Sequence, residues 1–333
     1  MQAGGGGSFD PAGSNSGPSN QEEKRAVFCR EWLEKNGAQG VYVDEALNVI
    51  YPVIKDGEPL EKQQLAVYAA HTDVVFPDLT PLPLTVDGNL ICCPGVGDDT
   101  ACLTALLIAA RFVARELHQD SLKLKNEGVL FVCNSGEEGL GNLKGSREIC
   151  RAFRKQMKEF ITLDGPMDKL VTRAVGSMRY QVEIRTRGGH SYGDFGQPNA
   201  IARMAELIAK LYQIPVPKGA KTTFNVGTIS GGTSVNTIAQ QAQMLYEFRS
   251  ESRDNLKYME EQFMELIHQA EAREDMEVSL TLVGERPCGG DVEEEAQEEL
   301  LDRARRTVQE IVGVKPQESA GSTDCNIPLS LGI

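Results

Sequence analysis

Three short apolar runs most strongly constrain how this chain can fold. They are LAVYAA at 65–70, GVLFVCN at 128–134 and FITL at 160–163. A short, continuous apolar run is typical of a strand that is buried on both faces of its sheet. Between the first two runs, the apolar residues of 100–117 recur at the spacing of an amphipathic helix. Strands that alternate with helices predict an α/β domain with a mostly parallel sheet.

A different pattern occupies the middle of the chain. From Met178 to Val283 the order is strand, helix, strand, strand, helix, strand. This order is a split β-α-β unit, and it predicts a ferredoxin-like α+β domain in two layers. A further helix at 293–312 follows, so we expect the middle domain to interrupt the α/β domain. The predicted segments are 21–175 for the first part of the α/β domain, 176–284 for the inserted domain and 285–333 for the second part.

Composition excludes several classes of protein. The 333 residues include 34 basic and 48 acidic side chains, so the net charge of −14 argues against binding to nucleic acid, which needs a basic surface. No apolar run is long enough for a transmembrane helix. The Gly/Ser-rich segment 1–20 has neither the basic start nor the apolar stretch of a signal peptide, and we expect it to be disordered. These features predict a cytoplasmic protein without a membrane partner, whose eight cysteines stay reduced.

Histidine or carboxylate groups follow each of the three apolar runs, and a glycine-rich turn offers one more carboxylate. Ligands of open α/β sheets bind at the carboxyl ends of the strands, so we expect these groups to lie together. One imidazole with several carboxylates suits a metal such as zinc. The residues are His71 and Asp73 after the first run, Glu137 and Glu138 after the second, Asp164 after the third, and Asp98 in the turn GVGDDT.

Each of these residues also has an ordinary structural interpretation. His71 alone is more often a hydrogen-bonded residue at a strand end, and Asp98 alone is more often a helix cap. Glu137 and Glu138 alone would form a solvated loop pair, and Asp164 alone a turn residue before glycine. The ordinary interpretations lose weight because all these groups are expected at one edge of one sheet. The combination therefore favours a metal site, although the single residues do not.

An ordered set of motifs resembles the M20 family of metallopeptidases. The motifs extend over about residues 21–333 and are HTD, GVGDDTACLTALL, NSGEEGLGNLKG, LDG, GGHSYGDFGQPNAI and GSTDCNIPLSLGI. The segment NVGTISGGTSVNTIAQQAQMLYEFRSES is most similar to the peptidase T-like branch. The resemblance implies a zinc-peptidase-like catalytic domain, which the ferredoxin-like domain interrupts as a lid that mediates dimerisation.

The resemblance implies a dinuclear zinc centre built from the motif residues. His71 and Asp164 resemble ligands of one zinc ion, Glu138 resembles a ligand of the other, and Asp98 resembles the carboxylate that bridges both. Asp73 resembles the aspartate that orients the histidine. The spacing agrees with this role, because side chains two apart on an extended segment lie on the same side and a carboxylate can accept the free ring N–H.

The resemblance also implies which residues act on the substrate. Glu137 matches the general base for water activated by the dinuclear site, since two adjacent glutamates can divide proton transfer and metal binding. His190 in GGHSYGDFG resembles a lid histidine that reaches the partner's active site in dimeric members and stabilises the oxyanion. Arg249 and Asn236 resemble residues that bind the substrate. Arg249 could instead be a surface charge at a strand end, and His190 a turn histidine.

The sequence departs from the family pattern at three places. It ends at Ile333, before the region in which family members carry a last histidine ligand, so we expect an apparently truncated chain with an incomplete second part of the catalytic domain and zinc occupancy of two or possibly one. The Gly/Ser-rich start replaces a helix and a short loop. Thr100 stands where members usually have lysine.

The sequence therefore predicts a hydrolase that cleaves an amide bond in small peptides, as an aminopeptidase does, and that forms a homodimer through the lid. A deacylase of N-acyl amino acids from the same family is the first alternative. A catalytically impaired homologue that acts as a dimerising binding protein is the second. A hydrolase with a single metal ion, held by His71, Asp98 and Asp164, is the third.

Overall fold

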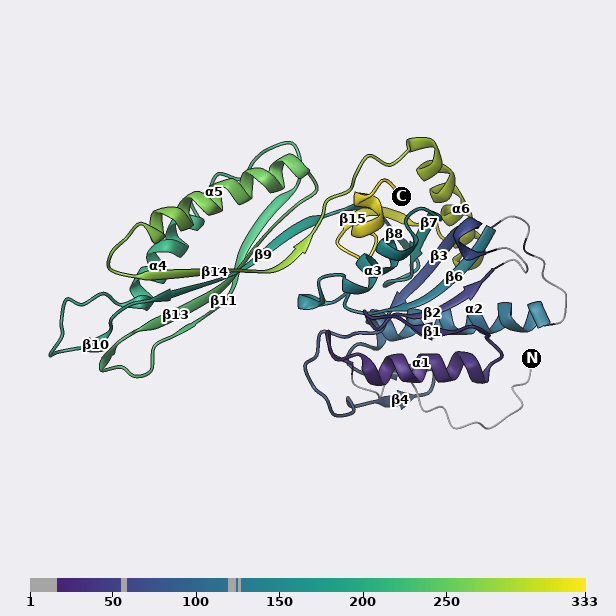
Figure 1. Cartoon of the computed structure of the whole chain (residues 1–333), viewed down its shortest axis with the longest axis horizontal. Coiled ribbons are helices and arrows are strands. Elements are labelled where there is room, and N and C mark those ends of the chain that lie inside the picture. Colours follow the sequence, from purple (N-terminus) through teal and green to yellow (C-terminus); the bar gives the residue numbers. More distant parts are fainter. Residues whose placement is uncertain (1–16, 55–58, 119–123, 125–126) are drawn as a thin grey trace. The chain divides into compact units, whose positions relative to one another are not determined.

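The computed structural model describes residues 17–54, 59–118, 124 and 127–333. Within these residues the chain forms two compact units (Figure 1). The first unit contains the described residues up to Leu170 together with Val292–Ser319 and Thr323–Ile333. The second unit contains Val171–Asp291 and Ala320–Ser322. The second unit therefore interrupts the first, as the sequence predicts.

A five-stranded sheet forms the centre of the first unit, with the strand order β1-β2-β6-β3-β7. β3 pairs in parallel with both β6 and β7, so the three predicted apolar runs form a parallel core. β1 and β2 are joined by a short turn and pair antiparallel, and β2 pairs antiparallel with β6, which makes the sheet mixed. The bounds are β1 (Tyr42–Val43), β2 (Val49–Val53), β3 (Gln64–His71), β6 (Glu127–Asn134) and β7 (Met157–Thr162).

Two hydrophobic clusters cover the two faces of this sheet. Side chains alternate along a strand, so Leu130 and Val132 of β6 lie in one cluster with α3, whereas Phe131 and Cys133 lie in the other with α1 and α2. The predicted helix after the glycine-rich turn is present as α2, and Leu103, Leu106 and Ala110 on its predicted apolar face are buried. The helices are α1 (Glu23–Lys35), α2 (Ala101–His118), α3 (Lys144–Phe153), α6 (Glu294–Val312) and α7 (Asn326–Ser330).

Short elements complete the first unit and its connections. They are the hairpin of β4 (Thr85–Asp87) with β5 (Leu90–Cys92), the ladder of β8 (Lys169–Ala174) with β15 (Gln317–Gly321), and the single turns η2 (Leu60–Lys62), η3 (Val96–Thr100) and η4 (Gly139–Gly141).

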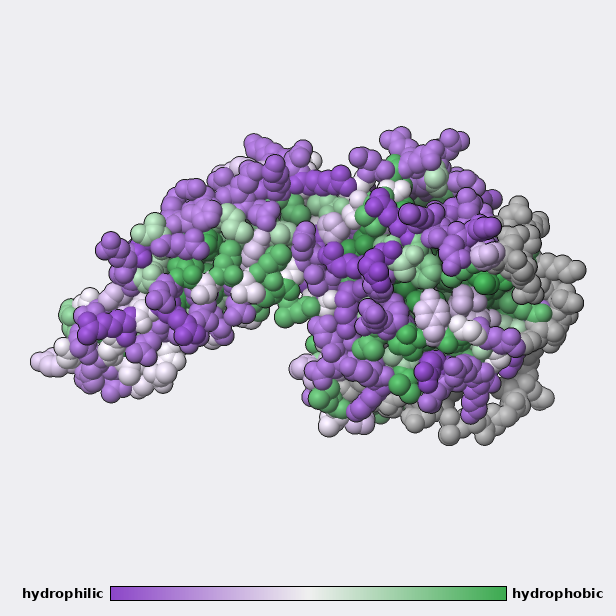
Figure 2. Space-filling model, viewed as in Figure 1, coloured by the Kyte–Doolittle hydropathy of each residue, from purple (hydrophilic) through white to green (hydrophobic). Residues whose placement is uncertain are grey.

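The second unit has the predicted ferredoxin-like plan. Its antiparallel sheet has the order β11-β13-β9-β14, and α4 and α5 pack on one face of it (Figure 1). Alternate residues of β13, such as Tyr246 and Phe248, are buried against these helices, while the surface over α5 is mostly hydrophilic (Figure 2). The bounds are β9 (Gly176–Arg185), β10 (Gly189–His190), α4 (Ala200–Leu211), β11 (Thr222–Gly231), β12 (Thr237–Ile238), β13 (Gln241–Ser250), α5 (Arg253–Glu271) and β14 (Glu277–Arg286).

The structure corrects one prediction at the start of the chain. Residues 1–20 were expected to be disordered, but 17–20 are packed against the first unit, and Gly17 and Pro18 are buried. The main chain of Gly17 and Pro18 pairs with Val74, which the low-complexity composition does not reveal. The remainder of the prediction, for residues 1–16, lies outside the described residues.

Two further expectations concern membranes and disulfides. None of the helices in the described ranges is long and apolar enough to cross a membrane. All eight cysteines are free thiols.

Candidate metal centre

Strand β3 carries His71 into the interior at its carboxyl end. His71 pairs with Asn134 of β6, and the backbone N–H and hydroxyl of Thr72 both donate to the Asn134 carbonyl, at 2.7 and 2.9 Å. The side chains of His71, Thr72 and Asp73 are completely buried. The parallel pairing of β3 with β6 therefore fixes His71 and Asp73 beside the residues that follow β6.

The two ring nitrogens of His71 have different partners. Nδ1 lies 3.0 Å from the Asp73 carbonyl oxygen and 3.5 Å from its carboxylate, and Nε2 lies 3.1 Å from the Asp98 carboxylate. A carbonyl can only accept, so Nδ1 carries a proton and Nε2 is the nitrogen that can bind a metal. Burial lowers the pKa of His71, but the hydrogen bonds to Asp73 and Asp98 outweigh it and hold the pKa well above its usual value.

The carboxylate of Asp73 connects the end of β3 to the loop after β6. Oδ1 accepts the backbone N–H of Glu137 at 2.9 Å, and Oδ2 accepts the backbone N–H of Glu138 at 2.9 Å. Burial raises the pKa of Asp73, but the interaction with His71 and these donors outweigh it and hold the pKa at about 2. Asp73 is therefore an anion that orients the predicted ligand His71 and the pair of glutamates at once.

The glycine-rich turn η3 delivers two carboxylates. Gly95 has φ +74°, and a Cβ there would lie 2.5 Å from Val74, so this tight turn requires glycine. The Asp98 side chain is 67% exposed, which leaves it open to a ligand from solvent. Asp99 is completely buried; its Oδ2 accepts the backbone N–H of His71 at 3.0 Å, and its Oδ1 has no hydrogen-bond partner among the described residues.

The loop after β6 places Glu137 and Glu138 in different surroundings. Glu137 is 5% exposed, whereas Glu138 is half-buried. Burial, followed by the negative charge of Asp98, raises the pKa of Glu138 to about 7. A carboxylate that is destabilised in this way gains from a nearby cation.

Two groups of side chains are close enough to hold a metal ion. The ligand atoms of His71, Asp98 and Glu138 lie within 4.8 Å of one another, and so do those of His71, Asp99 and Asp164. Nδ1 of His71 is hydrogen-bonded to the Asp73 carbonyl, which leaves Nε2 as the only ring nitrogen that can bind an ion. His71 can therefore bind the metal ion of only one of the two groups at a time. A centre with two ions then needs a carboxylate between them, and Asp98 is the exposed carboxylate beside both His71 and Glu138.

The chemistry of these side chains fits a divalent cation. Burial raises the pKa of Asp99 to about 8, and the charge of Asp164 acts in the same direction. The buried Asp99 Oδ1 without a hydrogen-bond partner is costly unless a cation or proton compensates it. Imidazole and carboxylate oxygens are the ligands of catalytic zinc sites.

Comparisons with known proteins show which peptidases this chain resembles in sequence and in fold. The family model described as peptidase dimerisation domain, of the M20 peptidases, matches residues 172–275, and the model for peptidase family M28 matches residues 48–186. The structure of a tripeptidase from Staphylococcus aureus is similar, with a TM-score of 0.69 at 21% sequence identity. The similar part comprises 97% of this chain and 85% of the tripeptidase chain. A dinuclear metal binding peptidase of the M20 family from Bacillus subtilis has a TM-score of 0.58 at 17% identity, covering 95% and 82%.

The chain resembles the M20 peptidases in its dimerisation domain and in its fold. Among curated relatives, the succinyl-diaminopimelate desuccinylase of Nitrosococcus oceani is 25% identical over 240 residues, which are 66% of this chain and 62% of the relative. The chain thus spans less than two thirds of that relative's length. The two units described above, an α/β domain and an inserted domain, are similar in fold to M20 peptidases.

The second unit, which is the predicted lid, carries the other predicted residues. Strands β10 and β12 bring His190 opposite Thr237, and the backbone N–H of Ser191 donates to the Asn236 carbonyl at 3.0 Å. The backbone N–H groups of Tyr192 and Gly193 donate to Nδ1 of His190, so Nε2 carries the ring proton. His190 is exposed.

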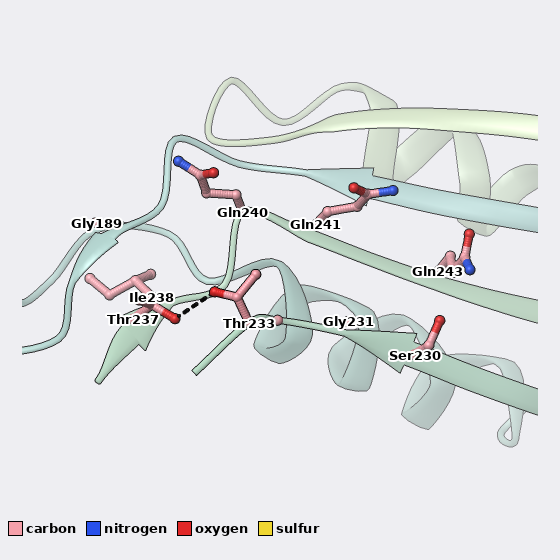
Figure 3. A pocket seen from close by; sticks show the side chains of 10 residues that line it. Gly189, Ser230, Gly231, Thr233, Thr237, Ile238, Gln240, Gln241 and Gln243 are labelled. Atoms are coloured by element: carbon pink, nitrogen blue, oxygen red, sulfur yellow. Dashed lines mark hydrogen bonds between the residues drawn. The ribbon is translucent and has the colours of Figure 1, made fainter. Parts of the chain in front are cut away.

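A polar pocket lies beside β10 in the same lid (Figure 3). Its hydroxyl and amide side chains include Thr233 and Thr237, whose hydroxyls are hydrogen-bonded at 3.1 Å, and Gln240. No charged residue lines it. Arg249 lies on β13, where its guanidinium donates to both carboxylate oxygens of Glu247 at 2.9 and 3.1 Å.

The structure brings the five predicted residues of the α/β domain that surround the candidate metal positions into one cluster: His71, Asp73, Asp98, Glu138 and Asp164. Their roles stay predictions. Sequence reasoning missed Asp99, which it treated only as part of a helix start. The adjacent acids of GVGDDT were the available signal, because a buried acid next to a candidate ligand itself needs compensation.

Proposed function

We propose that this protein is a metal-dependent hydrolase that cleaves an amide bond in small peptides, as an aminopeptidase does. The observation that carries the proposal is the cluster of one imidazole and several acids, with ligand atoms within 4.8 Å of one another, at the carboxyl ends of parallel strands. Its surplus of buried negative charge needs cations. The resemblance to M20 peptidases supports hydrolysis as the reaction.

We propose that two zinc ions are held at this cluster. His71 and Asp164 would hold one ion, Glu138 the other, and Asp98 would bridge them, while Asp99 lies beside the first. When bound, the metal would polarise the carbonyl of the substrate and make water a better nucleophile. Asp73 keeps the ring of His71 in place through Nδ1.

Glu137 is the general base in this proposal. Its backbone N–H is fixed by Asp73 at 2.9 Å, and its side chain is almost completely buried. A carboxylate in this position can accept a proton from the attacking water and deliver it to the leaving amine. No nucleophilic side chain is needed, because water attacks the carbonyl directly.

The lid supplies the remaining residues, and we propose that two chains dimerise through it. The match to the peptidase dimerisation domain supports this arrangement. His190 would act on the centre of a second copy of this chain, where its Nε2–H donates a hydrogen bond to the oxyanion. Nδ1 of His190 accepts two backbone N–H groups, so the ring proton is on Nε2 and can be donated to the oxyanion.

Arg249 and Asn236 would recognise the substrate. A guanidinium forms two parallel hydrogen bonds with a carboxylate, so Arg249 suits the free carboxylate of a peptide in exchange for Glu247. N-acyl amino acids also have a free carboxylate, and the Nitrosococcus relative is a desuccinylase. Deacylation is therefore the second candidate. The cytoplasmic location stays a prediction from the sequence.

The test is hydrolysis of dipeptides, tripeptides and N-acyl amino acids by the zinc-loaded chain. We expect Glu137→Gln to lower kcat by about 100-fold to 10,000-fold, the usual contribution of a general base, while zinc content stays unchanged. Glu127→Gln, at an exposed position on β6, is the matched control and should keep full activity. Equal activity of Glu137→Gln and wild type would refute the assignment of the base.

A further inference from the structure

The segment before α1, together with the first residues of that helix, lies against the residues that build the metal centre. We name residues 17–25 the N-terminal strap. The backbone N–H of Val74 donates to the Gly17 carbonyl at 3.0 Å, and Pro18 forms a parallel bridge with Val74. At the other end of the strap, the buried Arg25 donates to the Thr72 carbonyl at 2.7 Å. The strap therefore holds the main chain on both sides of Asp73.

One side chain of the strap reaches the functional groups. Ser19 Oγ lies 2.6 Å from Oδ2 of Asp73 and 3.0 Å from the carbonyl oxygen of Glu138. A hydroxyl donates one proton, so we assign its hydrogen bond to the nearer and charged acceptor, Asp73. Ser19 is half-buried, which makes the bond more persistent than one at the surface.

The contact matters because of what Asp73 already holds. Oδ2 of Asp73 also accepts the backbone N–H of Glu138, so Ser19 and Glu138 share one carboxylate oxygen. Rotation of the carboxylate would break both bonds and would also release the Glu137 N–H from Oδ1. The hydroxyl thus adds a third donor that opposes rotation of the carboxylate, which holds the two glutamates and faces Nδ1 of His71 at 3.5 Å.

We propose that Ser19 is a positioning residue of the metal centre, which fixes the Asp73 carboxylate and through it the Glu137–Glu138 loop and the negative charge that lies 3.5 Å from Nδ1 of His71. The inference rests on the proposed function. It concerns affinity for the metal and the geometry of the bound ion, because partners of ligand residues tune both.

The strap has anchors that do not involve Ser19. Glu22 is completely buried; it accepts the Asn20 backbone N–H at 2.8 Å and pairs with Lys144 at 2.8 Å. Removal of the Ser19 hydroxyl should therefore leave the strap in place. Its effect can then be separated from the effect of unfolding the segment.

The experiment measures binding of Co²⁺ to the metal-free full-length chain by visible absorption in competition with a chelator. We expect Ser19→Ala to raise the apparent Kd about tenfold, the lower end of what loss of such a partner costs, and to shift the absorption of the bound ion. Ser19→Thr, which keeps the hydroxyl, should restore wild-type affinity. Gln21→Ala, at an exposed position of the same strap, is the matched control and should bind as wild type. Ser19→Cys, a weaker donor of similar size, should shift Kd in the same direction as Ser19→Ala.

Unchanged Kd and absorption in both Ser19→Ala and Ser19→Cys would overturn the inference, and so would an equal loss in Gln21→Ala. Because no substrate is present, the outcome is independent of hydrolysis. A chain that binds Co²⁺ in a Ser19-dependent way but cleaves no amide would refute the proposed function alone. Loss of hydrolysis in Glu137→Gln with unchanged Kd in the Ser19 variants would refute only the role of Ser19.

Discussion

The replacement Asp73→Asn tests how the carboxylate of Asp73 supports the metal centre. Three donors converge on this carboxylate: the Glu137 N–H at 2.9 Å on Oδ1, and the Glu138 N–H at 2.9 Å and the Ser19 hydroxyl at 2.6 Å on Oδ2. Asparagine keeps one acceptor oxygen and replaces the other with an amide NH₂. In either orientation of the amide, one backbone N–H of the glutamate pair faces another donor.

The expected loss of stability in Asp73→Asn follows from the one backbone N–H that loses its acceptor. A buried N–H that loses its acceptor costs about 1–3 kcal/mol, so the free energy of unfolding of the metal-free chain should fall by that amount. Loss of the negative charge also weakens the support of His71. Replacement of such a partner costs about 10-fold to 100-fold in metal affinity, which is the larger and more specific effect.

Urea denaturation gives the free energy of unfolding of each variant, and Co²⁺ titration gives its metal affinity. Asp44→Asn is the control, because the Asp44 carboxylate is also held on both oxygens: Oδ1 accepts the backbone N–H groups of Ala46 and Asn48, both at 2.9 Å, and Oδ2 accepts the side-chain amide of Asn48 at 2.7 Å, which would face another donor in this variant. This control should lose stability without losing metal affinity. Wild-type Kd in Asp73→Asn, or an equal loss of affinity in Asp44→Asn, would refute the reasoning.

Two other predictions concern stability. Phe263→Ala in the lid removes a completely buried ring whose centroid lies 4.8 Å from that of Tyr180 and 5.2 Å from that of Tyr246. The variant should lower the free energy of unfolding by about 3–5 kcal/mol in urea denaturation and leave Co²⁺ affinity unchanged. Loss of Co²⁺ binding would contradict the separation of the two units. Burial raises the pKa of Asp324 to about 6, above its ordinary value near 4, so the folded state keeps a proton that the unfolded chain releases. The stability of the metal-free wild type relative to Asp324→Asn should therefore fall between about pH 4 and pH 7, and a difference that stays constant with pH would refute this.

Periodicity alone predicted the principal elements of both units. The runs at 65–70, 128–134 and 160–163 became β3, β6 and β7. In β3 and β6 burial on both faces demands apolar residues at almost every position, whereas the edge strand β7 is only partly buried. The hairpin β1–β2 has no such signal, since its strands are short and β2 contains Pro52. Its place depends on pairing with β6, which is a tertiary interaction.

The site could be predicted as far as it follows from strand ends. His71, Glu138 and Asp164 each follow a buried strand, so topology alone brings them together. Asp99 and Ser19 could not be assigned in this way. Their roles depend on which way a turn and a low-complexity segment fold back onto Asp73 and His71, and neither residue type announces that contact.

The central claim is that the cluster around His71 holds metal, and zinc content per chain tests it most directly. The chain is reconstituted with zinc, freed of loosely bound ions and measured by elemental analysis, together with His71→Ala and the control His268→Ala, whose histidine is exposed on α5. Both groups of ligand atoms include His71. The account predicts bound zinc, between one and two ions per chain, in wild type and His268→Ala, and its loss in His71→Ala. A wild type without zinc, or equal zinc content in all three proteins, would contradict it.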